Sequence, residues 1–165
     1  MHPISVERAM LMMFFVSIPI GYFTMPTILG FSSDVRFHLN KVYGAILMGS
    51  YMALVELFMH GYTTAYQGWA AGWFLLILAM SGVIYFQLGI GETEFLRGMI
   101  EHHGMGIKMA ERLLERNDVT SDTTILAKTI VDLQRKEIEQ MDELLEERRK
   151  KYIYRKTSSV NARVN

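Results

Sequence analysis

The stretch that decides the fold reads ETEFLRGMIEHHGMGIKMAERLL and occupies residues 92–114. Apolar residues, Phe95 and Met109 among them, recur in it with a helical period of 3.6, and charged residues, including Glu101, occupy the opposite, solvent-facing side. The apolar face also carries two adjacent histidines, His102 and His103, which are polar groups in a position normally reserved for core residues. We therefore expect an amphipathic helix whose packed side contains a polar site.

A second amphipathic stretch follows from about residue 122 to residue 149, after a short link in which Asp118 and Ser121 can cap helix ends. We expect Leu126, Leu133 and Leu144 among its inward-facing residues. A link this short predicts an antiparallel pair, so residues 92–147 are interpreted as a helical hairpin. With the turn centred near residue 119, His102 and His103 lie level with residues 135–136, close to Gln134 and Glu137.

The chain before this hairpin differs from it in charge and hydrophobicity. Residues 1–91 contain three basic and three acidic side chains, whereas residues 92–165 contain fourteen of each. Three stretches are long and apolar enough to cross a bilayer, at about residues 9–31, 42–60 and 69–90. The fold class we predict is all-α, with a membrane domain (1–91), the hairpin (92–147) and a basic tail (148–165). A purely soluble enzyme is excluded.

The second apolar stretch contains one carboxylate, Glu56, on a helical stripe with Met48, Met52 and His60. A carboxylate inside a membrane is costly, so Glu56 is expected to have a partner, a task in ion movement, or access to the interface. On the same stretch Ala45, Gly49 and Ala53 form a ladder of small residues, which favours close helix packing.

The hairpin offers donors that suit a metal ion. Two adjacent buried histidines are hard to satisfy by hydrogen bonds alone, and thioethers near imidazoles favour copper among the transition metals. The sequence has no cysteine, which excludes thiolate sites. The alternative is that His and Glu side chains simply hydrogen-bond one another in a structural scaffold that mediates oligomerisation.

The motif F-L-R-G-M-I-E-H-H at residues 95–103, followed by Gln134, Glu137, Ile138 and Met141, resembles the family catalogued as domain of unknown function 305. The resemblance covers most of residues 10–147 and implies a ferritin-like helical fold with periplasmic copper binding in some members. Glu101 and Gly106 depart from the family pattern, which commonly has Pro and Ala there. The candidate metal ligands implied by this resemblance are Met99, His102, His103, Met109, Gln134, Glu137 and Met141.

From these observations we predict a membrane-anchored protein that sequesters copper or maintains its homeostasis. A ferritin-like di-metal oxidase is the least favoured alternative, because the hairpin has no Glu-x-x-His motif. Nothing in the sequence indicates catalysis or a cofactor other than the metal ion.

Topology and partners complete the expectations. Arg8 against Arg36 and Lys41 favours a cytosolic hairpin by one residue, while the family resemblance implies the extracytoplasmic side, which we adopt. A two-helix hairpin buries a single seam, so a homodimer or higher oligomer is expected. The basic tail is either a solvated, disordered end or an attachment to anionic lipid headgroups. No motif indicates nucleic-acid binding.

Overall fold

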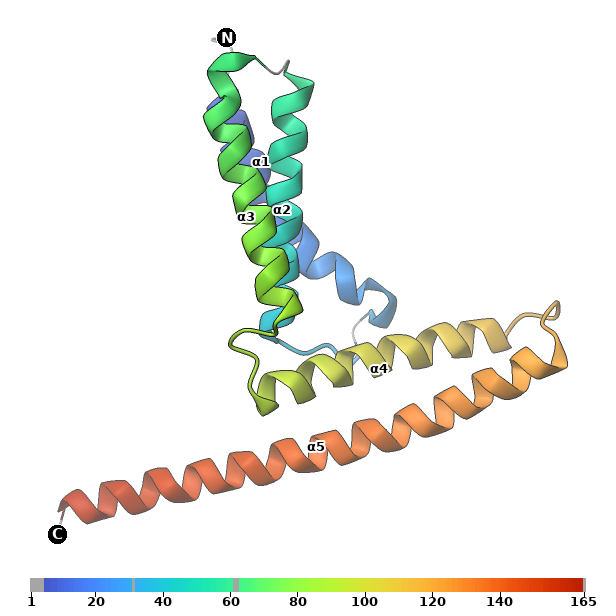
Figure 1. Ribbon diagram of the computed structural model, residues 1–165. Coiled ribbons are helices and arrows are strands. Elements are labelled where there is room, and N and C mark those ends of the chain that lie inside the picture. Colours follow the sequence, from blue (N-terminus) through green and yellow to red (C-terminus); the bar gives the residue numbers. More distant parts are fainter. Residues whose placement is uncertain (1–4, 31, 61–62, 165) are drawn as a thin grey trace. The chain divides into compact units, whose positions relative to one another are not determined.

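The computed structural model describes residues 5–30, 32–60 and 63–164, without the side chains of Met25 and of residues 160–164. Five α-helices and two short 3-10 helices make up the regular structure of these residues, in which no strand occurs (Figure 1). The chain is therefore all-α, as the sequence predicts. Its residues divide into two compact units. We call them the apolar unit (Met1–Thr27 and Phe37–Gly91) and the charged unit (Ile28–Arg36 and Glu92–Asn165).

The apolar unit contains α1 (Val6–Thr24), α2 (Leu39–Met59) and α3 (Gln67–Tyr85). All three meet in a core formed by Met10, Ala53, Leu57 and Trp73. The small-residue ladder of α2 is buried, and a Cβ added to Gly49 would stand 2.9 Å from the carbonyl oxygen of Phe14 in α1. Glycine at this position therefore allows the two backbones to approach closely.

Each helix of the apolar unit has the length and composition needed to cross a membrane, with spans Val6–Thr24, Leu39–Met59 and Thr64–Tyr85. The first and third helices end earlier than the predicted residues 31 and 90. Residues Met25–Leu29 form a 3-10 helix, because Pro26 disfavours continued α-helix at the residue before it. After Tyr85, positive φ angles at Gln87 (51°) and Gly89 (75°) turn the chain out of the helix. Phe31, the predicted end of the first span, lies outside the described residues.

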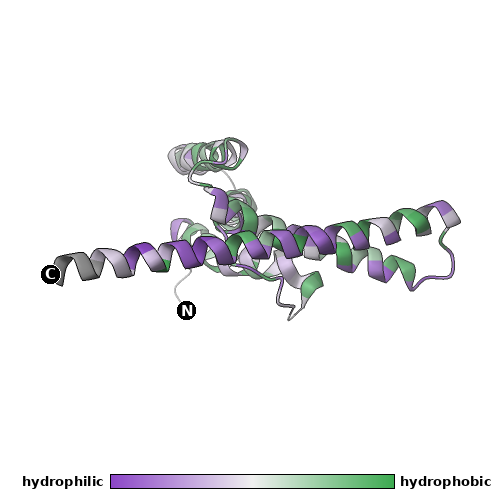
Figure 2. Cartoon of the chain, turned by 90° about the horizontal axis from the view of Figure 1, so that it is seen from below, coloured by the Kyte–Doolittle hydropathy of each residue, from purple (hydrophilic) through white to green (hydrophobic). Residues whose placement is uncertain are grey.

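The charged unit contains α4 (Glu92–Leu114) and α5 (Ser121–Val164), which lie side by side (Figure 1). Their shared core consists of Ile107, Ala110, Ala127 and Val131. Figure 2 shows hydrophilic and hydrophobic residues alternating along α5. The N-terminus of α5 is capped by Thr120 rather than by Asp118 or Ser121, since the Thr120 hydroxyl accepts a hydrogen bond from the backbone N–H of Thr123 at 3.4 Å.

Several apolar residues expected to face inward are exposed instead. On α4 these are Phe95 and Met109, and on α5 they are Leu126, Leu133 and Leu144. The apolar arc of each helix is wider than one helix–helix seam, so only part of it is covered by the neighbouring helix. The helix α5 also continues through the residues predicted as a tail, because no Gly or Pro interrupts the sequence between Arg148 and Val164.

The connecting segment, residues 28–36 between α1 and α2, belongs to the charged unit. Leu29 is buried, and a Cβ added to Gly104 of α4 would lie 2.9 Å from the Cβ of Asp34 and 3.2 Å from a methyl carbon of Leu29. The buried carboxylate of Glu101 accepts a hydrogen bond from the backbone N–H of Arg36. The prediction that Glu101 faces solvent opposite the histidines was wrong, because the connecting segment covers that face.

Candidate metal centre between α4 and α5

His103 and Glu137 join the two helices of the charged unit. The Nε2 of His103 lies 2.8 Å from Oε2 of Glu137, and Nδ1 of His103 lies 2.8 Å from the carbonyl oxygen of Met99. The His103 side chain is 13% exposed and that of Glu137 is 42% exposed. The pair therefore lies at the edge of the interhelical contact, reachable from solvent through its glutamate.

The hydrogen bonds of His103 define how its ring is oriented. A carbonyl oxygen can only accept, so Nδ1 is the donor to Met99. Nε2 is thereby directed at the Glu137 carboxylate. A histidine whose Nδ1–H is fixed by a backbone carbonyl has the arrangement that metal-binding histidines commonly show. The ring nitrogen and the carboxylate oxygen are both of the types that ligate metal ions, and they lie side by side.

Gln134 lies one turn from Glu137 and faces Gly106 of α4. A Cβ added to Gly106 would stand 2.5 Å from Oε1 of Gln134, so glycine provides the space that this amide occupies. The Oε1 atom is buried and has no hydrogen-bond partner among the residues that the structure describes. A buried acceptor without a hydrogen-bond partner costs free energy of folding. This one lies close to the His103–Glu137 pair along the two helices.

The other predicted ligands are placed less closely. His102 is exposed, with its ring centroid 6.0 Å from that of His103. Met99 and Met141 are half-buried, and Met109 is 62% exposed. Met109 and Gln134 both line an apolar groove of about 450 Å³ between α4 and α5. In the described part of the chain, no three His, Asp or Glu side chains are grouped so that they could hold a metal ion.

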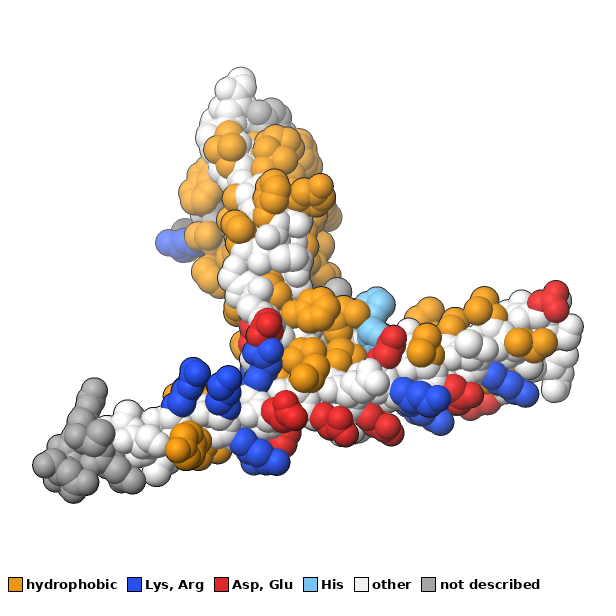
Figure 3. Space-filling model, turned by 60° about the horizontal axis from the view of Figure 1, so that its bottom comes forward, with side chains coloured by type: hydrophobic (Ala, Val, Ile, Leu, Met, Phe, Trp, Pro, Cys, Tyr) orange, Lys and Arg blue, Asp and Glu red, His pale blue; other side chains and the backbone are white. Residues whose placement is uncertain are grey.

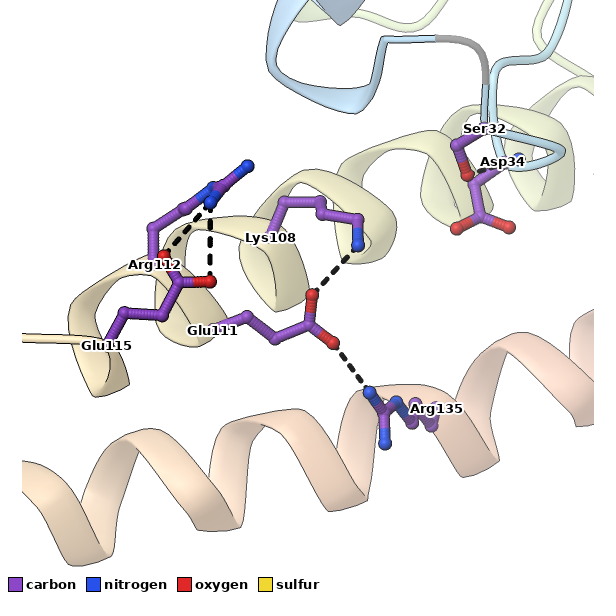
Figure 4. A network of polar contacts seen from close by, with 7 residues as sticks. All are labelled: Ser32, Asp34, Lys108, Glu111, Arg112, Glu115 and Arg135. Atoms are coloured by element: carbon purple, nitrogen blue, oxygen red, sulfur yellow. Dashed lines mark hydrogen bonds and ion pairs between the residues drawn. The ribbon is translucent and has the colours of Figure 1, made fainter.

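A network of charged side chains lies about two turns nearer the link (Figure 4). The Glu111 carboxylate accepts from Nζ of Lys108 at 2.9 Å and from Arg135 of α5 at 2.6 Å. The hydrogen bond from Lys108 lowers the pKa of Glu111, desolvation opposes it, and the hydrogen bond from Arg135 lowers it further. The sequence pattern gives no sign of this interhelical pair, which depends on the rotation of α5 about its axis.

The stripe on α2 contains one ion pair. Nδ1 of His60 lies 3.3 Å from Oε1 of Glu56, whose side chain is 16% exposed. Glu56 thus has the partner expected for a carboxylate in an apolar helix. Met48 is exposed and Met52 is half-buried.

Comparison with known proteins agrees with the motif at residues 95–103. A family model described as "Domain of unknown function (DUF305)" matches residues 90–159. The chain is also 30% identical over 143 residues to "Uncharacterized protein L153" of Acanthamoeba polyphaga mimivirus, covering 84% of this chain and 92% of the viral protein. No solved structure matches the chain. The alignment with the viral protein extends over more of the chain than the family model does, and the chain belongs to the family of domain of unknown function 305.

Proposed function

We propose that this chain is a membrane-anchored metal-binding protein that sequesters copper or maintains its homeostasis. The observation that carries the proposal is the orientation of His103, whose Nδ1–H donates to the Met99 carbonyl while Nε2 meets Glu137. Because the imidazole nitrogen and the carboxylate oxygen of the Nε2–Oε2 pair are both of the types that ligate metal ions, this pair is the centre of the proposed site.

The two helices also carry other residues of the types that bind copper. His102 adds a second imidazole, and the buried, unpartnered Oε1 of Gln134 adds an oxygen donor. The half-buried Met99 and Met141 and the exposed Met109 supply thioether sulfurs on the same two helices. Imidazole with thioether donors favours Cu(I) over zinc or iron. The metal would supply the binding free energy, and the chain would supply the orientation of its donors.

The apolar unit is the proposed anchor. Its three helices are long and apolar enough to cross a bilayer. An odd number of crossings puts the beginning of α1 and the charged unit on opposite sides of the membrane. We propose that the charged unit lies on the extracytoplasmic side, where copper is met before it enters the cell.

The proposed assembly is a homodimer in which two copies of the α4–α5 hairpin form a ferritin-like four-helix bundle. Phe95, Met109, Leu126 and Leu133 are exposed on the charged unit, and two of them, Met109 and Leu126, line the groove. A second copy would bury these side chains and bring a second set of His and Met donors toward the first. Leu133→Glu is expected to convert dimer to monomer in native mass spectrometry, and a monomeric wild type would contradict this assembly.

A structural scaffold is the second candidate. The observation in its favour is that His103 and Glu137 satisfy one another without a metal. The two candidates differ in one measurable property, since a ligand that binds only the folded state raises the melting temperature. Copper should raise the melting temperature of a metal-binding protein and leave that of a scaffold unchanged.

The test is a competitive Cu(I) titration of the full chain in detergent, with melting temperature as a second readout. His103→Ala should weaken Cu(I) binding by about tenfold or more. The matched control is His60→Ala, which removes a histidine from another His–Glu pair, in α2. Binding that is equally tight in wild type, His60→Ala and His103→Ala would contradict the site, and weak binding in all three would favour the scaffold.

A further inference from the structure

The end of the charged unit opposite the link contains a pocket of about 490 Å³ with four arginines in its lining. Arg36 comes from the connecting segment, Arg97 from α4, and Arg148 and Arg149 from α5. Thr93 and Tyr152 also line the pocket, as do the two carboxylates of Asp142 and Glu146. Three segments that are far apart in the sequence therefore place guanidinium groups around one cavity.

Carboxylates hold these arginines in position. The NH2 nitrogen of Arg36 contacts both oxygens of Asp142, at 2.9 and 3.2 Å, and Arg148 pairs with Glu92. Arg97 pairs with Glu94 at 3.2 Å, and Arg149 pairs with Glu146 at 3.1 Å. The contact to the carboxylate is made by one nitrogen in each of Arg97, Arg148 and Arg149, and a guanidinium has five N–H donors in all. The guanidinium groups are thus pre-oriented and can still donate to a further anion.

The part of α5 that follows Glu147 is positively charged. The sequence contains seven Lys or Arg residues and no acidic residue after Glu147. Figure 3 shows Lys and Arg side chains gathered toward the C-terminal part of α5, close to hydrophobic side chains. Tyr152, Ile153 and Tyr154 are exposed there. Basic residues interleaved with tyrosines are typical of helices that lie at the headgroup level of a membrane.

When α2 and α3 cross a bilayer, chain connectivity limits how far Arg36 and Glu92 can lie from its surface. Arg36 precedes the first residue of α2 by three residues, and Glu92 follows the last residue of α3 by seven. At about 3.5 Å per residue these links reach at most roughly 10 Å and 25 Å. Because α2 and α3 would cross the bilayer in opposite directions, both links emerge on the same side. Arg148 forms an ion pair with Glu92, so it lies near the end of the second link.

We propose that this arginine pocket binds the phosphate of an anionic phospholipid headgroup, with the basic residues of α5 after Glu147 lying along the same leaflet. The proposal rests on membrane anchoring, and it is independent of copper. Guanidinium groups from several directions match the several oxygens of a phosphate, and neighbouring lysines add attraction for an anionic surface. The exposed tyrosines have the amphipathic rings that favour this depth.

The test is lipid binding by the full chain, reconstituted in nanodiscs of phosphatidylcholine with or without phosphatidylglycerol and measured by native mass spectrometry and melting temperature. Wild type should retain phosphatidylglycerol and melt at a higher temperature in its presence. Arg148→Gln/Arg149→Gln should weaken retention by roughly tenfold. The control is Arg112→Gln/Arg116→Gln, which removes two exposed arginines that also form ion pairs, with Glu115 and Asp118 near the link.

Each outcome decides the proposal. Equal retention by wild type and Arg148→Gln/Arg149→Gln would overturn it, as would an equal loss in the control. If inorganic phosphate in detergent stabilises the chain as much as phosphatidylglycerol does, a soluble anion replaces the lipid and the proposal fails. Arg149→Gln alone, which changes an exposed residue, covers the case in which the double variant does not fold. Resistance to carbonate extraction tests membrane anchoring separately, and Cu(I) titration of the arginine variant tests the metal site.

Discussion

Glu101 of α4 and Arg36 of the connecting segment are joined by a hydrogen bond of 2.8 Å, from the backbone N–H of Arg36 to the carboxylate Oε2, although 65 residues separate them. Glu101 is only 2% exposed. The same residue, Arg36, reaches Asp142 of α5 through its guanidinium. One residue of the connecting segment therefore contacts both long helices of the charged unit.

Glu101→Ala is expected to lower the free energy of unfolding by about 2–3 kcal/mol, because the substitution leaves a buried N–H without its charged acceptor. Thermal unfolding followed by circular dichroism in detergent measures the effect. The control is Glu115→Ala, which removes an exposed carboxylate paired with Arg112 and should cost less than about 1 kcal/mol. Equal losses in the two variants would contradict a structural role for the Glu101 hydrogen bond.

Two glycines of α4 should respond oppositely to alanine. In Gly104→Ala the new methyl group meets the Cβ of Asp34, which cannot move without its backbone, so a loss of about 1–3 kcal/mol is expected. In Gly106→Ala the methyl group meets the far end of the Gln134 side chain, which can rotate away. Gly106→Ala should therefore be neutral or stabilise by up to about 1 kcal/mol through helix propensity. Chemical denaturation distinguishes them, and a destabilised Gly106→Ala would show that Gln134 is held rigidly.

The stability of the charged unit should depend on pH through Glu111. Its pKa is lowered in the folded state from the ordinary 4.5, chiefly by the hydrogen bond from Lys108. The stabilisation is therefore complete above about pH 4.5 and is lost as the pH falls through the lower folded-state pKa. Glu111→Gln should remove this part of the pH dependence, an effect below about 1 kcal/mol because the carboxylate is partly exposed. Melting temperatures between about pH 3 and 6 test it, and identical slopes for the two proteins would refute it.

The sequence is informative wherever a property depends on neighbouring residues. Apolar length predicts three helices that can cross a membrane, and counting from a turn near residue 119 places His103 and Glu137 at one level, where the structure shows them in contact. The prediction that His102 and His103 face inward together was wrong in part. Adjacent residues on a helix differ by about 100° in direction, and the neighbouring helix covers only His103.

The remaining errors arise from contacts between distant segments. A helical wheel assigns Glu101 to solvent, because it describes one helix alone and does not include the connecting segment that packs there. It likewise assigns Leu133 to the core, although Ala127 and Val131 form the contact with α4. The four-arginine pocket combines residues from three parts of the chain, and no spacing rule along one helix could have found it.

The docking of the connecting segment on α4 sets a boundary for any attempt to transplant the proposed metal site. The matched family region begins at residue 90, yet Glu101 and Gly104 are covered by residues 28–36. A fragment cut at the family boundary would keep His103 and Glu137 but uncover the buried Glu101 carboxylate and the side of α4 at Gly104. A fragment that preserves this packing must therefore carry the connecting segment together with α4 and α5.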